Sequence, residues 1–244
     1  MISPVAQAAS PISTQFIPPR FVWLHGFASG PGTSKGRLVR TRLAERGAWL
    51  ALPDLNQPSF RGLTVGRMLG RVHELWEESA PSKLVLFGSS LGGYTAAAWA
   101  ALHPERCAAL VLLAPAFALG PRWTQRMDPK DVSRWHAERS LEFEHYAWGR
   151  REALGIEFLE DAAQRPDFPL PEAKTLVLQG TRDDVVEPAL AREFTARMQA
   201  AGRSATLVEL DEGHELTGDL PGLWRTIEAF IAPWLYEKPS AFPT

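Results

Sequence analysis

The chain has 244 residues, of which 45% are hydrophobic and 22% charged, and its formal net charge is −2. This length suits one α/β domain with a large core, and it is too short for two ordinary domains with linkers. The near-neutral charge, without any basic run, excludes the electrostatic footprint of a nucleic-acid or anionic-membrane partner.

The terminal segments are predicted to be tails outside the domain. Residues 1–19 have no basic start and no continuous apolar stretch, so they do not resemble a signal peptide and are expected to be disordered. Residues 237–244 are expected to form a second tail, which leaves 20–236 as the domain. No apolar run is long enough to span a bilayer, and the single cysteine, Cys107, excludes an internal disulfide or a cysteine-based metal cluster. We therefore expect a cytoplasmic location.

Apolar, β-rich runs alternate with helical patterns along the domain, and this order is typical of a parallel sheet with helices on both faces. We predict a three-layer α/β fold with about six parallel strands. Such sheets bind ligands at the carboxyl ends of their strands. The predicted strands are 21–24, 48–52, 83–87, 108–113, 175–179 and 205–210, and the predicted helices are 34–46, 65–79, 90–102, 188–200 and 220–235.

The turn after the third predicted strand has the pattern of a nucleophile elbow. Residues 88–92 read G-S-S-L-G, which places Ser90 at the apex of G-x-S-x-G. The turn is so tight that the residues two before and two after the serine have almost no room for a Cβ. Ser90 meets this rule with glycines, whereas Ser89 has bulky residues at those places. For a lone match, a glycine-rich turn whose serine only caps the helix is the simpler alternative.

A serine hydroxyl needs a base to become a nucleophile, and the base needs an acid to hold its tautomer. On an elbow of this kind the acid and the histidine follow the serine, each in a loop after a later strand. The strand 205–210 is followed by His214, and this rule selects His214 alone among the six histidines. The strand 175–179 is followed by Asp183 and Asp184, and the residues alone leave both open as the acid.

Residues 116–170 interrupt the alternation and are rich in aromatic side chains. We expect this segment to be a lid of amphipathic helices that roofs the site and supplies an apolar pocket. The residues predicted to bind substrate are Trp123, Trp135, Tyr146 and Trp148. Alternatively, these side chains only attach the insertion to the body, and the pocket then lies in the loops around Phe27 and Pro58. The arginines of the segment, Arg122 and Arg126 among them, are expected to form a solvated face.

These motifs together resemble the YqiA-type branch of small bacterial α/β-hydrolases. The resemblance covers roughly residues 20–235 and implies a three-layer α/β-hydrolase fold with 116–170 as the lid. In resembling families the acid lies three residues after the glycine, which favours Asp183 over Asp184. The matching stretches are 25–29 (H-G-F-A-S), 53–56 (P-D-L-N), 88–94 (G-S-S-L-G-G-Y), 114–116 (A-P-A) and 180–184 (G-T-R-D-D).

The same resemblance implies an oxyanion hole. The residues His25-Gly26-Phe27 resemble the HG-x signature of this fold, in which a main-chain N–H after the glycine faces the reacting carbonyl. The second donor is then the N–H of Leu91, the residue after the nucleophile. His25 is expected to orient the loop by hydrogen bonding.

The resemblance implies an esterase-like serine hydrolase that cleaves small to medium carboxylic esters through an acyl-enzyme. A thioester is the closest alternative substrate, and a cofactor-free haloperoxidase or perhydrolase activity is compatible with the same groups. A non-catalytic binding protein of this fold is the rival from another class, and it would be marked by the loss of a triad member; none is missing. We expect a small-molecule ester as partner, no nucleic acid, no membrane and no metal or organic cofactor. The oligomeric state cannot be read from the sequence.

Overall fold

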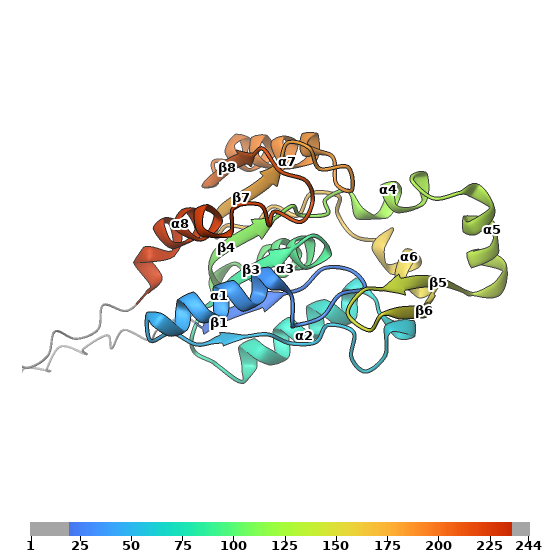
Figure 1. The fold of residues 1–244 in the computed structure, drawn as a ribbon, viewed down its shortest axis with the longest axis horizontal. Coiled ribbons are helices and arrows are strands. Elements are labelled where there is room, and N and C mark those ends of the chain that lie inside the picture. Colours follow the sequence, from blue (N-terminus) through green and yellow to red (C-terminus); the bar gives the residue numbers. More distant parts are fainter. Residues whose placement is uncertain (1–19, 236–244) are drawn as a thin grey trace, which may run out of the picture.

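A six-stranded parallel sheet forms the centre of the molecule (Figure 1). The computed structural model describes residues 20–235, so the predicted tails lie outside the described residues. The strand order is β2-β1-β3-β4-β7-β8, and every neighbouring pair is parallel. This arrangement confirms the predicted fold class. The strands are β1 (Arg20–Leu24), β2 (Leu50–Ala51), β3 (Leu84–Ser89), β4 (Cys107–Leu113), β7 (Lys174–Gly180) and β8 (Ala205–Leu210).

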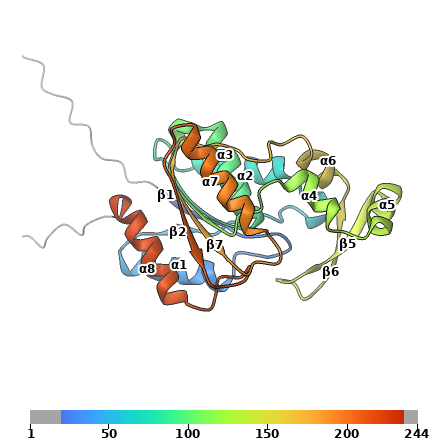
Figure 2. The same ribbon diagram turned by 90° about the horizontal axis from the view of Figure 1, so that it is seen from above.

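Five helices cover the two faces of the sheet, as seen most clearly in Figure 2. The helices α1 (Ser34–Glu45) and α8 (Leu220–Ile231) lie together on one face. The other face carries α2 (Val65–Glu77), α3 (Leu91–Leu102) and α7 (Pro188–Ala200). Three short 3₁₀ helices complete the body: η1 (Phe60–Gly62), η2 (Pro104–Arg106) and η3 (Ala232–Trp234).

The central strands are buried on both faces because helices cover both sides of the sheet. Alternate side chains of each strand point to opposite faces and therefore enter different cores. In β3, Leu84 and Leu86 enter a first core, which is shared with α2, α3, α7 and the segment that follows β4. The intervening Val85 and Phe87 enter a second core, which is shared with α1 and α8. One sheet therefore separates two hydrophobic cores. Within residues 20–235, no helix is both long and apolar enough to cross a membrane.

The insertion between β4 and β7 differs from the predicted set of helices. It contains α4 (Leu119–Gln125), α5 (Pro129–Glu138) and α6 (Glu157–Ala162), and also an antiparallel hairpin of β5 (Ser140–His145) and β6 (Arg150–Gly155). The hairpin packs on the body because the apolar Leu141 and Phe143 of β5 face the first core, while Glu142 and Glu144 face solvent. The ends of the insertion meet, since the Ala118 N–H donates a 2.9 Å hydrogen bond to the Asp167 carbonyl.

Candidate active site

Ser90 occupies the apex of the turn from β3 into α3. Its backbone has φ 53° and ψ −118°, a conformation that non-glycine residues rarely adopt. The turn is fixed by a 2.9 Å hydrogen bond from the Ser90 N–H to the Leu113 carbonyl of the neighbouring strand. A Cβ at Gly88 would overlap the main chain of Gly92, and one at Gly92 would overlap the carbonyl of Leu24. The flanking glycines are therefore required by close backbone approach, and the hydroxyl is raised above the sheet edge.

Asp183 and His214 come from the loops after β7 and β8 and form a hydrogen-bonded pair. The His214 Nδ1 lies 2.9 Å from Asp183 Oδ2. Three further donors hold the same carboxylate: Gln179 Nε2 at 2.8 Å from Oδ2, and the N–H groups of Val185 and Val186 at 2.9 and 2.8 Å from Oδ1. Burial alone would raise the pKa of Asp183, but the hydrogen bonds from His214 and these donors outweigh it and hold the pKa below its usual range.

Asp184, by contrast, is exposed, and its main-chain carbonyl accepts a hydrogen bond from Arg126. The structure thus brings Asp183, and not Asp184, to the imidazole. Because Nδ1 of His214 is engaged by Asp183, Nε2 is the ring nitrogen left for a nucleophile. Ser90 and His214 line the same cavity, although among the described residues no hydrogen bond joins them. Such bonds are often long without substrate and tighten in the complex.

The predicted oxyanion donors, Phe27 and Leu91, also lie at this cavity. Within the described chain, neither of their main-chain N–H groups has a hydrogen-bond acceptor. The buried His25 fixes the first donor: its Nδ1 is 2.9 Å from the Gly26 carbonyl, and its Nε2 accepts a 2.9 Å hydrogen bond from the Leu55 N–H. This second contact requires an unprotonated Nε2, so Nδ1 carries the proton and donates it. Since the Gly26 carbonyl and the Phe27 N–H belong to one peptide group, holding the carbonyl aims the N–H.

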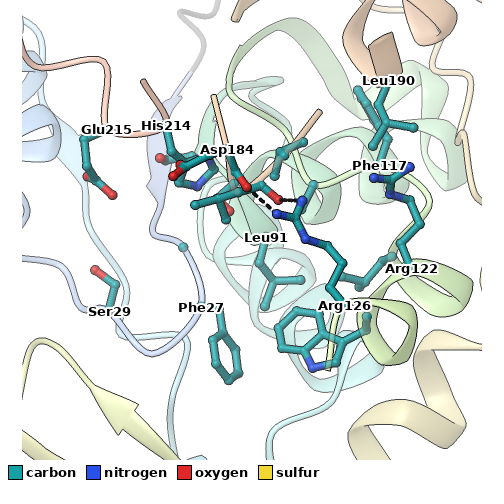
Figure 3. Close-up of a pocket in the computed structure, with 18 of the residues that line it drawn as sticks. Phe27, Ser29, Leu91, Phe117, Arg122, Arg126, Asp184, Leu190, His214 and Glu215 are labelled. Atoms are coloured by element: carbon teal, nitrogen blue, oxygen red, sulfur yellow. Dashed lines mark hydrogen bonds between the residues drawn. The ribbon is translucent and has the colours of Figure 1, made fainter. Parts of the chain in front are cut away.

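The cavity has a volume of about 910 Å³ and is bounded by the strand ends and the insertion (Figure 3). Of the four aromatic residues predicted to bind substrate, Trp123 and Tyr146 line this cavity. The structure does not bring Trp135 and Trp148 to it. Trp135 of α5 is fully buried against the hairpin, where its Nε1 donates a 3.0 Å hydrogen bond to the Leu154 carbonyl. Trp148 stacks on the ring of His145, with centroids 3.7 Å apart. Neither role can be read from a sequence in which all four side chains are equally aromatic.

Three cationic side chains at the cavity were not predicted as site residues: Lys35, Arg122 and Arg126. Arg126 donates to the main-chain carbonyls of Val185, at 2.6 Å, and Asp184, so that α4 is tied to the loop that carries Asp183. Arg122 forms an ion pair with Glu187. In the sequence these arginines lie among many charged residues, and no signal distinguishes them from a solvated face.

The comparison with known families is decisive for the membership of the chain. The model of the uncharacterised protein family UPF0227 matches residues 20–231. The chain belongs to this family. The match agrees with the resemblance to the YqiA-type branch. A search of curated protein sequences finds no match.

Solved structures of other proteins share the fold of this family member. Est1E from Butyrivibrio proteoclasticus with bound ferulic acid is 17% identical, with a TM-score of 0.74 and 94% of each chain covered. The α/β-hydrolase domain-containing protein 10 from mouse is 17% identical, with a TM-score of 0.68, and 88% of this chain and 90% of that chain are covered. A monoacylglycerol lipase from Paleococcus ferrophilus is 21% identical, with a TM-score of 0.60 and coverage of 90% and 96%. The chain therefore has the α/β-hydrolase fold.

The chemistry open to this site is nucleophilic. A hydroxyl at a strained turn, an imidazole oriented by a carboxylate and two free main-chain N–H groups line one cavity, and together they suit acyl transfer. Among residues 20–235, no group of three or more histidine, cysteine, aspartate or glutamate side chains is arranged to hold a metal ion.

Proposed function

We propose that this protein is a serine hydrolase that cleaves carboxylic esters through an acyl-enzyme. The observation that carries the proposal is the placement of Ser90 and the Asp183–His214 pair at one cavity, with the strained elbow exposing the hydroxyl. The names of the structural neighbours, which include an esterase from Pyrococcus furiosus and the monoacylglycerol lipase, support the same reaction class.

In the first half of the proposed reaction, Ser90 Oγ attacks the ester carbonyl carbon, and its proton passes to His214 Nε2. The Phe27 and Leu91 N–H groups stabilise the oxyanion of the tetrahedral intermediate. Collapse of this intermediate breaks the bond to the alcohol oxygen, which leaves with the proton from His214. Asp183 stabilises the transient imidazolium throughout.

The second half repeats these steps with water. His214 takes a proton from the water that attacks the acyl-enzyme, and it returns the proton to Ser90 Oγ when the carboxylic acid leaves. The predicted ester partner and the cytoplasmic location are parts of the same proposal, and cell fractionation checks the location. A thioester would be cleaved by the same groups, and a comparison of butyryl-CoA with p-nitrophenyl butyrate tests that alternative.

Labelling with a fluorophosphonate probe tests the proposed nucleophile. We expect the wild-type protein to be labelled and to hydrolyse short p-nitrophenyl esters. Ser90→Ala should abolish labelling and lower kcat by roughly 10⁴-fold or more, as expected for loss of the nucleophile. Ser89→Ala is the matched control and should keep both activities, because Ser89 ends β3 and does not form the apex. Labelling that survives in Ser90→Ala, or equal loss in both variants, would disprove the assignment.

A further inference from the structure

The cavity has two chemically different sides. Figure 3 shows Ser29 and Glu215 on one side of Leu91, and Phe117 and Leu190 on the other. The guanidinium group of Arg122 also lies on the Leu190 side, where it pairs with Glu187. That of Arg126 lies beside Asp184 and binds main-chain carbonyls. An acyl chain fits the apolar side, and the chemistry of the opposite side therefore decides which alcohol can be accommodated.

Lys35 places a positively charged hydrogen-bond donor on the Ser29 side of the cavity. It lies in the first turn of α1, only 4% exposed, and its Nζ donates a 2.6 Å hydrogen bond to the Glu215 carbonyl. The Glu215 carboxylate is 3.7 Å away, and its side chain is 76% exposed. An ammonium has three N–H donors. In the part of the chain that the structure describes, the Glu215 carbonyl is the one hydrogen-bond acceptor for Nζ, so donors remain for a ligand in the cavity that Lys35 lines.

The remaining polar groups on this side are of mixed type. The Ser29 hydroxyl lines the cavity and has no hydrogen-bond partner among the described residues, since Asn56 binds the Ser29 carbonyl instead. The Glu215 carboxylate can only accept hydrogen bonds, whereas the ammonium of Lys35 can only donate them. The carboxylate offsets the positive charge of Lys35, so the subsite has no net attraction for an anionic ligand. An apolar ligand would leave the remaining donors of the buried ammonium without acceptors. A hydroxyl group both donates and accepts, and it satisfies both.

We propose that Lys35, Ser29 and Glu215 form a subsite for a hydroxylated leaving group, so that the preferred substrates are esters of a polyol such as glycerol. This inference rests on the proposed ester hydrolysis and deepens it by naming the alcohol. The acyl chain lies on the Phe117 and Leu190 side, and the free hydroxyls of the alcohol bind the ammonium, the serine hydroxyl and the carboxylate.

The test compares two esters with the same acyl group, 1-monobutyrin and butyl butyrate, and measures kcat/KM for each. The wild-type protein should prefer monobutyrin by about tenfold or more, as expected for hydrogen bonds to a charged group. Lys35→Met should lower this ratio by about tenfold, and Ser29→Ala and Glu215→Gln should each lower it about threefold. Ser29→Ala keeps the carbonyl that binds Asn56, so it changes little besides the hydroxyl.

Two control variants are available. Lys83→Met removes an exposed lysine that directly precedes β3, at the end of the strand opposite to Ser90, and should leave the ratio unchanged. Leu190→Ala should shift the preferred acyl length without changing the ratio. Thermal unfolding shows whether each variant is folded, and Ser29→Ala decides the question if Lys35→Met does not fold.

Three results would overturn the subsite. The first is an equal kcat/KM for the two esters in the wild-type protein. The second is an equal loss of kcat/KM on both esters in Lys35→Met, together with no change of ratio in Ser29→Ala. The third is a preference for the butyryl ester of a hydroxy acid, such as 3-hydroxybutyrate, over monobutyrin. Failure of the proposed function looks different: Ser90 is then not labelled by the fluorophosphonate and no ester is cleaved.

Discussion

Asp183 and Asp184 are adjacent in the sequence, yet only Asp183 is buried and bonded to His214. Asp183→Asn should lower kcat for p-nitrophenyl butyrate by about 10⁴-fold, because an amide favours the wrong tautomer of the imidazole. Asp184→Asn is the matched control and should stay within a few-fold of wild type. Steady-state kinetics on both variants check the prediction, and the reverse ranking would show that the acid is misassigned.

His25 acts through the Gly26–Phe27 peptide and is a positioning residue. His25→Phe should lower kcat by about 10- to 100-fold with little change in KM, because the Phe27 N–H matters most when the oxyanion forms. It should also lower the free energy of unfolding by about 1–3 kcal/mol, since the Leu55 N–H loses its acceptor. The control His73→Phe changes a partly exposed histidine on α2 and should leave kcat unaltered. A proportional rise in KM would contradict this assignment.

Burial lowers the pKa of Lys35 below its ordinary value of 10.5, and the nearby Glu215 offsets only part of this effect. Between the folded pKa and 10.5, the unfolded chain binds a proton that the folded protein does not, so the free energy of unfolding rises with pH. Lys35→Met should remove this rise. Urea unfolding at a series of pH values that approach 10.5 should therefore show that the variant becomes less stable relative to the wild-type protein as the pH increases. A difference that stays constant with pH would refute the argument.

At the scale of elements, the insertion contains tryptophans with two different roles. Trp135→Ala should lower the free energy of unfolding by about 3–5 kcal/mol and leave the ester chain-length profile flat, because Trp135 is a core residue. Trp123→Ala should change the preferred chain length, because Trp123 lines the cavity. Urea unfolding and kcat/KM across a p-nitrophenyl ester series separate the two effects. Identical behaviour of the two variants would mean that the insertion does not shape the pocket.

The helices and strands were predicted correctly where a local sequence pattern is compatible with only one kind of structure. The parallel sheet follows from alternating runs, and the elbow follows from glycines that close backbone contacts require. The hairpin of β5 and β6 was missed, although its alternation is present in the sequence, because six-residue runs between helices are also compatible with helix. The helix α8 was predicted to reach residue 235 but ends at Ile231, because Pro233 favours the tighter η3.

The site was predictable only where order along the chain was informative. The order along the chain indicates Ser90 and His214 but leaves Asp183 and Asp184 both open as the acid. In the structure Ser90 and His214 line one cavity, and Asp183 is hydrogen-bonded to His214. Lys35 contacts a residue 180 positions away, and no local pattern marks such a pairing. Which aromatic side chain faces the cavity is likewise decided by tertiary packing.

At the scale of the whole molecule, the two cores share one sheet, so we expect that neither core can unfold without the other. Leu86→Ala in the first core and Phe87→Ala in the second should each lower the free energy of unfolding, by about 2–5 and 3–5 kcal/mol. Both variants should unfold in one transition that is the same by near-UV and far-UV circular dichroism. Separate transitions in either variant would show that the cores are independent.

The hydrogen bond between Ala118 and Asp167 joins the two ends of the insertion, so the insertion can change in evolution without a change in the body of the fold. The chain leaves and re-enters the body at nearly the same place, and Ser90, Asp183 and His214 all lie outside the loop so formed. During evolution this one segment can therefore be lengthened, shortened or exchanged, which would change the specificity for acyl groups while Ser90, Asp183 and His214 stay in place.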